Sequence, residues 1–337
     1  MIKKNKLINL KKEITSAKNP LFLFDNDTDG VVSLTLLLKK INTENFYPLK
    51  TFPKITSSFL KKILSLYPDL VVILDKPLED ENFFNILNKE GTKVLIIDHH
   101  EIKKNFSNVE IFNSFPSSEP TSYIIQKSFG SKESEWLALI GCIADFYLPK
   151  FFKNFIKEYR ELFYQGNLFD LIYSSEIGKI ARMIDYSSIS SDEKIRDLVK
   201  FLLKAKNPYD ILIENEKNNF IHEKFKEIDE IIKKNSEKAK VFDNFVYLEY
   251  GGKTSLSSEI ANFLYFKNQK KFIVVCYKGD SVINISLRGK NAKKLTEEIT
   301  SKIKESSGGG HELACGLKIK TEDFENFKNI ISKKFKT

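Results

Sequence analysis

The sequence predicts an α/β protein in three parts. These are an N-terminal domain with helices on both faces of a parallel sheet, a helical connector, and a smaller α+β C-terminal domain. Three short apolar runs, at 20–25, 70–75 and 94–99, alternate with helical patterns in the first half. They lack polar alternation, as is typical of parallel strands buried on both faces. After residue 240 strand-like runs return with a hairpin turn, which indicates a second sheet. We place the three parts at 1–190, 191–238 and 239–337.

Helical patterns account for most of the chain between the strand-like runs. The segment 134–146 is strongly apolar, and the amphipathic segment 192–208 would end at Pro208. The segment 215–238 is highly charged, which is typical of a solvated helix and predicts part of the connector. Other helices are expected at 31–41, around 55–66, and at 167–184, 255–266, 291–304 and 322–335.

Composition narrows the class of protein. The chain has 337 residues, 42% of them hydrophobic, which is enough for two domains with a sizeable core. No apolar stretch reaches the about 20 residues of a membrane span, and no apolar signal core follows the basic N-terminus. Three widely spaced cysteines argue against a disulfide framework. We therefore expect a cytoplasmic protein that does not enter a membrane.

The net charge of +9 is compatible with a nucleic acid as partner. It is equally compatible with a lysine-rich, AT-biased proteome, in which Asn, Ile and Phe are also frequent. Candidate lysines for phosphate contacts lie in the C-terminal domain, although they could equally form a solvated face. They are Lys270, Lys271, Lys290, Lys293 and Lys294.

Each of the three apolar runs in the first half ends in acidic residues. The first leads into DNDTDG at 25–30, the second ends at Asp75, and the third leads into Asp98, His99 and His100. The carboxyl ends of parallel strands meet at one edge of a sheet, where ligands bind. So many carboxylates would repel one another unless a cation lay between them. Carboxylates mixed with imidazoles suit a divalent ion such as Mn²⁺, Fe²⁺ or Zn²⁺.

Taken singly, several of these acids could have a simpler role. An Asp-x-Asp-x-Asp-Gly segment also opens a calcium loop, but position 12 is Leu36 and not the required Glu. Asp25 or Asp29 could cap the following helix, and Asp75 could be a turn residue. Asp145, flanked by apolar residues, must be paired or bind metal if it is buried, or it could cap a turn.

Together these segments resemble the DHH phosphoesterase superfamily. Four of them match its motifs in order: DNDTDG, the acid of VVILD, the DHH triplet and the acid of GCIAD. In the C-terminal half, SSGGGHELACG at 306–316 resembles the GGGH signature of the DHH-associated substrate-binding domain. SLSSEIAN at 255–262 resembles another recurrent feature of that domain. The resemblance covers most of the chain, at about 18–150 and 240–335.

The resemblance implies a centre of two Mn²⁺ ions, for which Mg²⁺ or Co²⁺ could substitute. Asp75 would bridge the ions, His100 would face the scissile phosphate, and Asp98 would support the imidazoles. The implied metal ligands are Asp25, Asp27, Asp29, Asp75, His99 and Asp145. The implied phosphate-binding residues of the C-terminal domain are Arg288, Ser257, His311 and a turn formed by Gly308, Gly309 and Gly310.

Two positions indicate the branch of the superfamily. Leu23 stands where nanoRNase and pAp-phosphatase members carry a histidine, and Asp25 resembles the RecJ side. The length and layout resemble archaeal RecJ-like nucleases. We therefore expect an exonuclease that releases nucleoside monophosphates from single-stranded DNA or RNA, with replication or repair proteins as possible partners. Two alternatives are a nanoRNase, pAp phosphatase or cyclic-dinucleotide phosphodiesterase, and an inactive replisome scaffold related to Cdc45.

Overall fold

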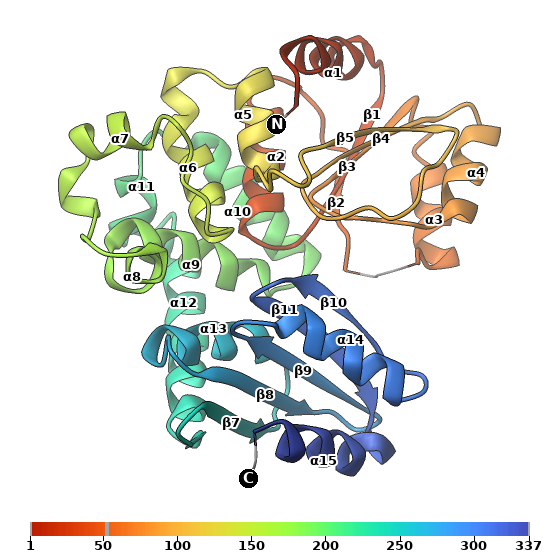
Figure 1. Ribbon diagram of the computed structural model, residues 1–337. Helices are drawn as coiled ribbons and strands as arrows, with labels where there is room; N and C mark the ends of the chain where they lie inside the picture. The colour runs from red at the N-terminus through yellow and green to blue at the C-terminus, as the bar shows by residue number, and fades with distance from the viewer. Residues whose placement is uncertain (1, 51–53, 336–337) are drawn as a thin grey trace. The chain divides into compact units, whose positions relative to one another are not determined.

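The computed structural model describes residues 2–50 and 54–335. The chain divides into two compact units, Met1–Phe225 and Lys226–Thr337, which are described separately. The division falls inside helix α12 (Asn219–Ser236). The N-terminal unit contains a five-stranded sheet and the C-terminal unit a six-stranded sheet (Figure 1). The finer division at 190 and 238 stays a prediction.

All five strands of the N-terminal sheet are parallel, in the order β2-β1-β3-β4-β5. The three apolar runs form its centre, as predicted. The short β2 and the half-buried β5 form its edges, and neither was expected from the sequence. The strands are β1 (Pro20–Phe24), β2 (Phe46–Pro48), β3 (Leu70–Leu74), β4 (Lys93–Asp98) and β5 (Val109–Asn113).

Helices cover both faces of this sheet, which confirms the predicted α/β class. Alternate strand residues face opposite sides, so that Phe22 and Val72 join one hydrophobic core while Leu23 and Ile73 join another. The larger core lies against α1 (Lys4–Ser16), α2 (Thr28–Leu38), α5 (Thr121–Phe129) and α6 (Glu135–Ala144). The smaller core lies against α3 (Ser57–Leu64) and α4 (Glu81–Lys89).

The single helix predicted at 167–184 is wrong, because the chain forms two helices that break at Ser175. This residue is extended, with φ −112° and ψ 157°, and its hydroxyl accepts a hydrogen bond from Gly178 N–H. Gly178 lies so close to the preceding helix that a Cβ would be 2.2 Å from the Leu171 carbonyl oxygen. The helical part consists of α7 (Phe152–Glu158), α8 (Leu168–Ser174), α9 (Glu176–Ser188), α10 (Asp192–Lys204) and α11 (Tyr209–Leu212).

The C-terminal unit is α+β, as predicted. Its sheet has the order β10-β11-β9-β8-β7-β6; β7 and β8 pair in parallel, and the other described pairs are antiparallel. Helices α14 (Ala292–Lys302) and α15 (Phe324–Phe335) pack on one hydrophobic core, and α13 (Ser257–Lys267) contacts β8 and β9. The strands are β6 (Lys240–Val241), β7 (Phe245–Tyr250), β8 (Phe272–Lys278), β9 (Val282–Arg288), β10 (Ser307–His311) and β11 (Ala314–Lys320).

Two further expectations concern the whole chain. Cys142, Cys276 and Cys315 are all free and buried, so they form no disulfide framework. Among the described helices, none combines the length and the apolar character that crossing a membrane requires.

Candidate metal centre

The acidic residues that end the central strands lie at one edge of the N-terminal sheet. Asp25 directly follows β1, Asp75 follows β3, and Asp98 is the last residue of β4. Because the three strands are parallel neighbours, their carboxyl ends lie side by side. His99 and His100 continue from β4 at the same edge.

Four of the predicted ligands come together at this edge. Asp29, Asp75, His99 and Asp145 each offer one ligand atom, and these atoms all lie within 4.8 Å of one another. His99 Nε2 is 3.3 Å from Asp75 Oδ1 and 3.1 Å from Asp145 Oδ2. A second such group contains Asp75, Asp98, His99 and His100, so Asp75 and His99 belong to both groups.

Helix ends bring Asp29 and Asp145 to the strand edge. Asp29 lies in the first turn of α2, and Asp145 caps the C-terminus of α6. Asp29 is fully buried and accepts hydrogen bonds from Thr121 N–H at 2.7 Å and Ser122 N–H at 3.1 Å. These are the first two residues of α5, so the positive end of the α5 dipole faces the carboxylate.

Asp75 combines an unusual backbone conformation with a buried carboxylate that is only partly hydrogen-bonded among the described residues. Its φ is +59°, in the left-handed region that aspartate tolerates better than most residues. Its Oδ1 accepts a hydrogen bond from the Thr121 hydroxyl at 3.1 Å. Its Oδ2 is buried and has no hydrogen-bond partner among residues 2–50 and 54–335. A buried carboxylate oxygen without a donor is costly, and a cation would remove that cost.

The electrostatics of the group also fit a cation. Burial raises the pKa of Asp75 and of Asp145 well above the ordinary value, and the charges of Asp29 and Asp27 raise both pKa values further. Burial likewise raises the pKa of Asp29, against the hydrogen bonds from Thr121 and Ser122. A divalent ion would favour the charged carboxylates and so reverse these shifts. The donor set of carboxylates and one imidazole therefore fits a metal.

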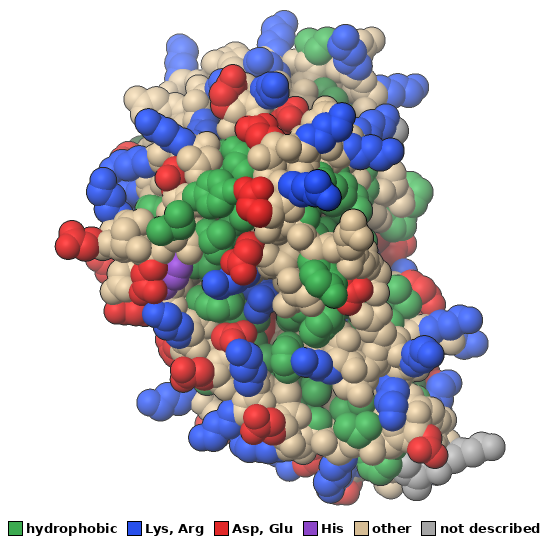
Figure 2. All heavy atoms as spheres, turned by 90° about the vertical axis from the view of Figure 1, so that its left-hand side faces the viewer, with side chains coloured by type: hydrophobic (Ala, Val, Ile, Leu, Met, Phe, Trp, Pro, Cys, Tyr) green, Lys and Arg blue, Asp and Glu red, His purple; other side chains and the backbone are tan. Residues whose placement is uncertain are grey.

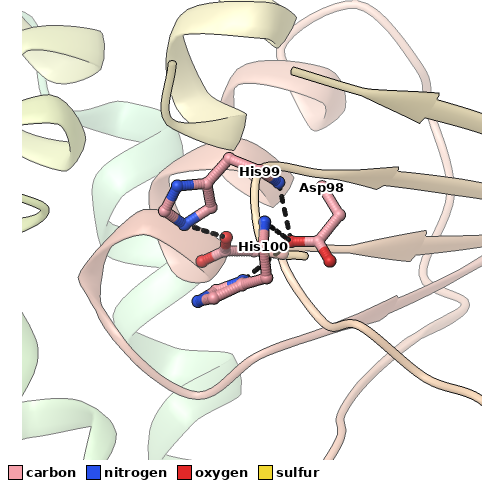
Figure 3. A group of neighbouring side chains, drawn as sticks. Asp98, His99 and His100 are labelled. Carbon is pink, nitrogen blue, oxygen red and sulfur yellow. Dashed lines mark hydrogen bonds and ion pairs between the residues drawn. The ribbon is translucent and has the colours of Figure 1, made fainter. Parts of the chain in front are cut away.

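Asp98 organises the two histidines (Figure 3). One of its oxygens, Oδ1, accepts from His99 N–H at 2.8 Å and His100 N–H at 3.3 Å, and lies 2.9 Å from His100 Nδ1. The two imidazole centroids are 4.2 Å apart. Burial alone would raise the pKa of Asp98 and lower that of His100. Their hydrogen bond and opposite charges outweigh burial, so the pKa of Asp98 falls and the pKa of His100 rises.

Asp25 and Asp27 have other partners and are members of neither four-residue group. Asp25 Oδ2 is 2.6 Å from Lys76 Nζ, and burial together with the Asp27 charge raises the Asp25 pKa to about 6. Asp27 is the N-cap of α2, where its carboxylate accepts from Gly30 N–H at 2.9 Å. The sequence offered Asp25 or Asp29 as a possible helix cap, but the structure gives this role to Asp27, and Asp29 lies inside the helix.

Two residues of the site were missed by sequence reasoning. Lys76 neutralises Asp25, and Thr121 bonds both Asp75 and Asp29. Lys76 directly follows a strand-end acid, and Thr121 follows Pro120, which is a common helix start. These signals were present, but nothing in the sequence paired either residue with its partner.

In the C-terminal unit, two of the predicted phosphate-binding residues share one end of the sheet. Arg288 and His311 are both in register with Ala314 of β11, from opposite sides. The Arg288 guanidinium is largely buried and donates to Asn262 Oδ1 at 2.6 Å and to Ser258 Oγ at 2.7 Å. It therefore ties β9 to α13.

Ser257 and the glycines occupy different environments. Ser257 is buried at the start of α13 and accepts a hydrogen bond from Ser286 Oγ at 3.0 Å. The predicted turn at Gly308, Gly309 and Gly310 is wrong, because these residues lie in the exposed strand β10. Gly310 has φ +140° and approaches β11 so closely that a Cβ would be 2.3 Å from the Ala314 carbonyl oxygen. Glycine is thus required there for strand pairing.

The net positive charge does not gather on the face shown in Figure 2. Lys and Arg side chains are spread over that face and are interspersed with Asp and Glu. Of the candidate lysines, Lys271 already donates to the Phe242 carbonyl oxygen at 2.5 Å. The role of the lysines in phosphate binding stays a prediction.

Comparison with known proteins gives one domain match and several similar folds. Residues 242–337 match the DHHA1 domain model, and no curated protein matches the chain. A crystal structure of exonuclease RecJ bound to manganese has a TM-score of 0.65 at 15% identity, covering 98% of this chain and 94% of that chain.

Two other solved structures have the same fold. The pGpG-specific phosphodiesterase PggH from Vibrio cholerae has a TM-score of 0.52 at 15% identity, over 94% of this chain and 98% of that chain. CDC45 from Entamoeba histolytica has a TM-score of 0.58 at 12% identity, over 99% of this chain and 98% of that chain. At these identities the likeness establishes the fold.

Proposed function

We propose that the chain is a metal-dependent phosphodiesterase of the DHH phosphoesterase superfamily, which its C-terminal DHHA1 match and its RecJ-like fold support. One observation carries the proposal. Asp29, Asp75, His99 and Asp145 bring their ligand atoms within 4.8 Å of one another at the carboxyl edge of a parallel sheet. Active sites of α/β folds lie at this edge.

Asp29, Asp75, His99 and Asp145 would hold the metal, together with Asp27 as a further ligand. Two bound divalent ions, Mn²⁺ in the first place, would supply the charge that activates a water and stabilises the attacking and leaving oxygens of a phosphodiester. The protein's own part is to hold the side chains of the ligands in place. Asp29 is fixed by α5, and Asp75 by the Thr121 hydroxyl.

His100 would act on the phosphate itself. Its side chain is 32% exposed while that of Asp98 is fully buried, so the imidazole can meet a substrate and the carboxylate cannot. Asp98 holds Nδ1 of His100, and Nε2 would contact a phosphate oxygen. The raised pKa of His100 favours the charged imidazolium, which suits an anionic phosphate.

The finer proposal is a single-strand exonuclease that releases nucleoside monophosphates. It is supported by the likeness to RecJ over nearly the whole length of both chains and by the net charge of +9. Binding to backbone phosphates would weaken as salt increases. A second candidate, a phosphodiesterase for dinucleotides or other short substrates, is supported by the likeness to PggH.

Matched end-labelled DNA and RNA oligomers of two to about twenty nucleotides, digested with Mn²⁺, test the proposal. We expect a ladder of mononucleotide steps from one end of one polymer, and complete loss of activity with EDTA. Asp75→Asn and His99→Ala should each lower the rate at least about 10³-fold, since each removes a ligand shared by both metal groups.

The same experiment separates the candidates. Turnover confined to two- to four-mers would favour the short-substrate enzyme over the exonuclease. If every oligomer stays intact with Mn²⁺, Mg²⁺ and Co²⁺, an inactive scaffold like CDC45 replaces both enzymes. Asp192→Ala is the matched control, because Asp192 is exposed and pairs with the exposed Lys50.

A further inference from the structure

The loop 114–120, which joins β5 to α5, is bonded to the candidate metal centre at its first end. Asn113, the last residue of β5, donates from its side-chain amide to the His100 carbonyl oxygen at 2.8 Å. Ser114 N–H donates to the Asp98 carbonyl oxygen at 3.1 Å. The loop therefore starts beside the backbone of the Asp-His-His triplet.

The other end of the loop is bonded to the same centre. The chain enters α5 at Thr121, whose N–H bonds Asp29 and whose hydroxyl bonds Asp75. Within the loop, the Ser114 hydroxyl donates to the Glu119 carbonyl oxygen at 2.7 Å and is buried. A short segment that is held at both ends and whose ends are also bonded to each other has little backbone freedom.

This loop presents one large apolar side chain to solvent, that of Phe115. The residue is 47% exposed. Its N–H donates to Asn113 Oδ1 at 2.6 Å, and the same Asn113 side chain bonds the His100 carbonyl oxygen. A single side chain thus links the backbone of Phe115 to that of His100. The backbone of an exposed aromatic residue is therefore held close to the backbone of the residue that would face the phosphate.

Exposed hydrophobic residues are common, and most need no explanation. Tyr67, for example, is 85% exposed, but it precedes β3 and so lies at the opposite edge of the sheet. Phe115 differs because its loop is built into the candidate metal centre. An anionic phosphate group does not stack on an aromatic ring, whereas a nucleobase offers a flat π face. Stacking of a base on an aromatic side chain contributes about 1–3 kcal/mol per base.

We propose that Phe115 stacks on a nucleobase of the substrate and thereby selects phosphodiesters that carry bases over those that do not. The proposal rests on the phosphodiesterase function proposed above and names its substrate class. The restrained backbone of the loop lowers the entropy cost of the contact, because the segment that carries the ring does not have to be ordered on binding. Stacking tolerates any base, so Phe115 selects for a base without reading its identity.

Steady-state kinetics with Mn²⁺ test this on oligothymidylate and on an abasic oligomer of equal length. For Phe115→Ala we expect KM for oligothymidylate to rise about 5- to 150-fold, with little change in kcat. The wild type should have a higher kcat/KM for the base-bearing oligomer than for the abasic one, and in Phe115→Ala the ratio of these two values should fall towards one. Phe115→Trp should keep the wild-type KM, and Tyr67→Ala is the control for an exposed aromatic residue at the opposite edge.

Binding of the same two oligomers, followed by fluorescence anisotropy with Ca²⁺, gives a readout independent of turnover. If Phe115→Ala weakens the binding of both oligomers equally, Phe115 has a structural role and the proposal is wrong. If the variant binds both oligomers as tightly as the wild type does, the ring contacts something else, such as a protein, and the proposal is equally wrong. A wild type that binds with Phe115-dependent base preference but hydrolyses nothing would overturn the phosphodiesterase function and leave the stacking role.

Discussion

The carboxylate of Asp98 has a positioning role that its neighbours make visible. One oxygen receives two backbone N–H groups and lies 2.9 Å from His100 Nδ1. It sets the direction in which the chain leaves β4 and fixes the ring of His100 at the same time. Partners of this kind orient metal-binding and catalytic imidazoles.

Asp98→Ala is expected to lower kcat/KM by about 10- to 100-fold, because both histidines lose the group that orients them. Asp98→Asn keeps an oxygen acceptor for the two N–H groups and should lose less. The measurement is oligomer hydrolysis at several Mn²⁺ concentrations. Wild-type activity in Asp98→Ala would contradict the positioning role, and Asp192→Ala again serves as the exposed-carboxylate control.

At the scale of residues, the sequence indicated which side chains form the candidate site better than it indicated which residues they bond to. Acids at strand ends were recognised because a parallel sheet must bring its carboxyl ends together. The pairing of Asp25 with Lys76 could not be foreseen, since it depends on the turns that follow two different strands. The burial of Asp29 against α5 depends in the same way on a helix about ninety residues later.

At the scale of elements, the predictions succeeded where a segment is buried on both sides. The central strands β1, β3 and β4 each contain an unbroken apolar run and were recognised as strands. The edge strands β2 and β5 were not, because one is only three residues long and the other is only half-buried. The glycines of β10 form a strand only because β11 supplies the hydrogen-bond partners, which local sequence does not show.

Helix α6 packs very closely against the candidate metal centre, and Gly141 makes this possible. A Cβ at this position would be 2.5 Å from Ser122 Oγ and 3.0 Å from Asp29 Oδ1. The same helix carries Asp145 at its C-terminal end. Any outward shift of α6 would therefore move one proposed ligand, Asp145, and disturb another, Asp29.

Gly141→Ala is expected to destabilise the N-terminal unit by about 1–3 kcal/mol, as overpacking commonly does. It should also weaken Mn²⁺ binding, because both Asp29 and Asp145 are displaced. Urea unfolding and calorimetric Mn²⁺ titration measure the two effects. Gly316→Ala is the matched control, since a Cβ at Gly316 would meet nothing within 4 Å. Equal behaviour of the two variants would rule out the close-packing argument.

At the scale of the whole N-terminal unit, the acid cluster is an electrostatic burden without metal. Burial raises the pKa of Asp27, Asp29, Asp75 and Asp145, and that of Asp25 to about 6. The folded unit therefore holds more protons than the unfolded chain between about pH 4 and pH 6. The free energy of unfolding of this unit must therefore fall as pH rises through that window, because the folded state binds more protons than the unfolded state and is the one that a falling proton concentration disfavours.

Mn²⁺ should relieve this burden, and its effect should depend on pH in a definite direction. In EDTA the melting temperature is expected to fall between about pH 5 and pH 7.5, while saturating Mn²⁺ should raise it by about 5–10 °C at the higher pH and by less at the lower. Asp75→Asn removes a carboxylate from both metal groups. This variant should be more stable than the wild type in EDTA at pH 7.5 and should respond little to Mn²⁺. Thermal unfolding of both proteins at the two pH values checks the prediction, and a Mn²⁺ effect that is larger at pH 5 would refute it.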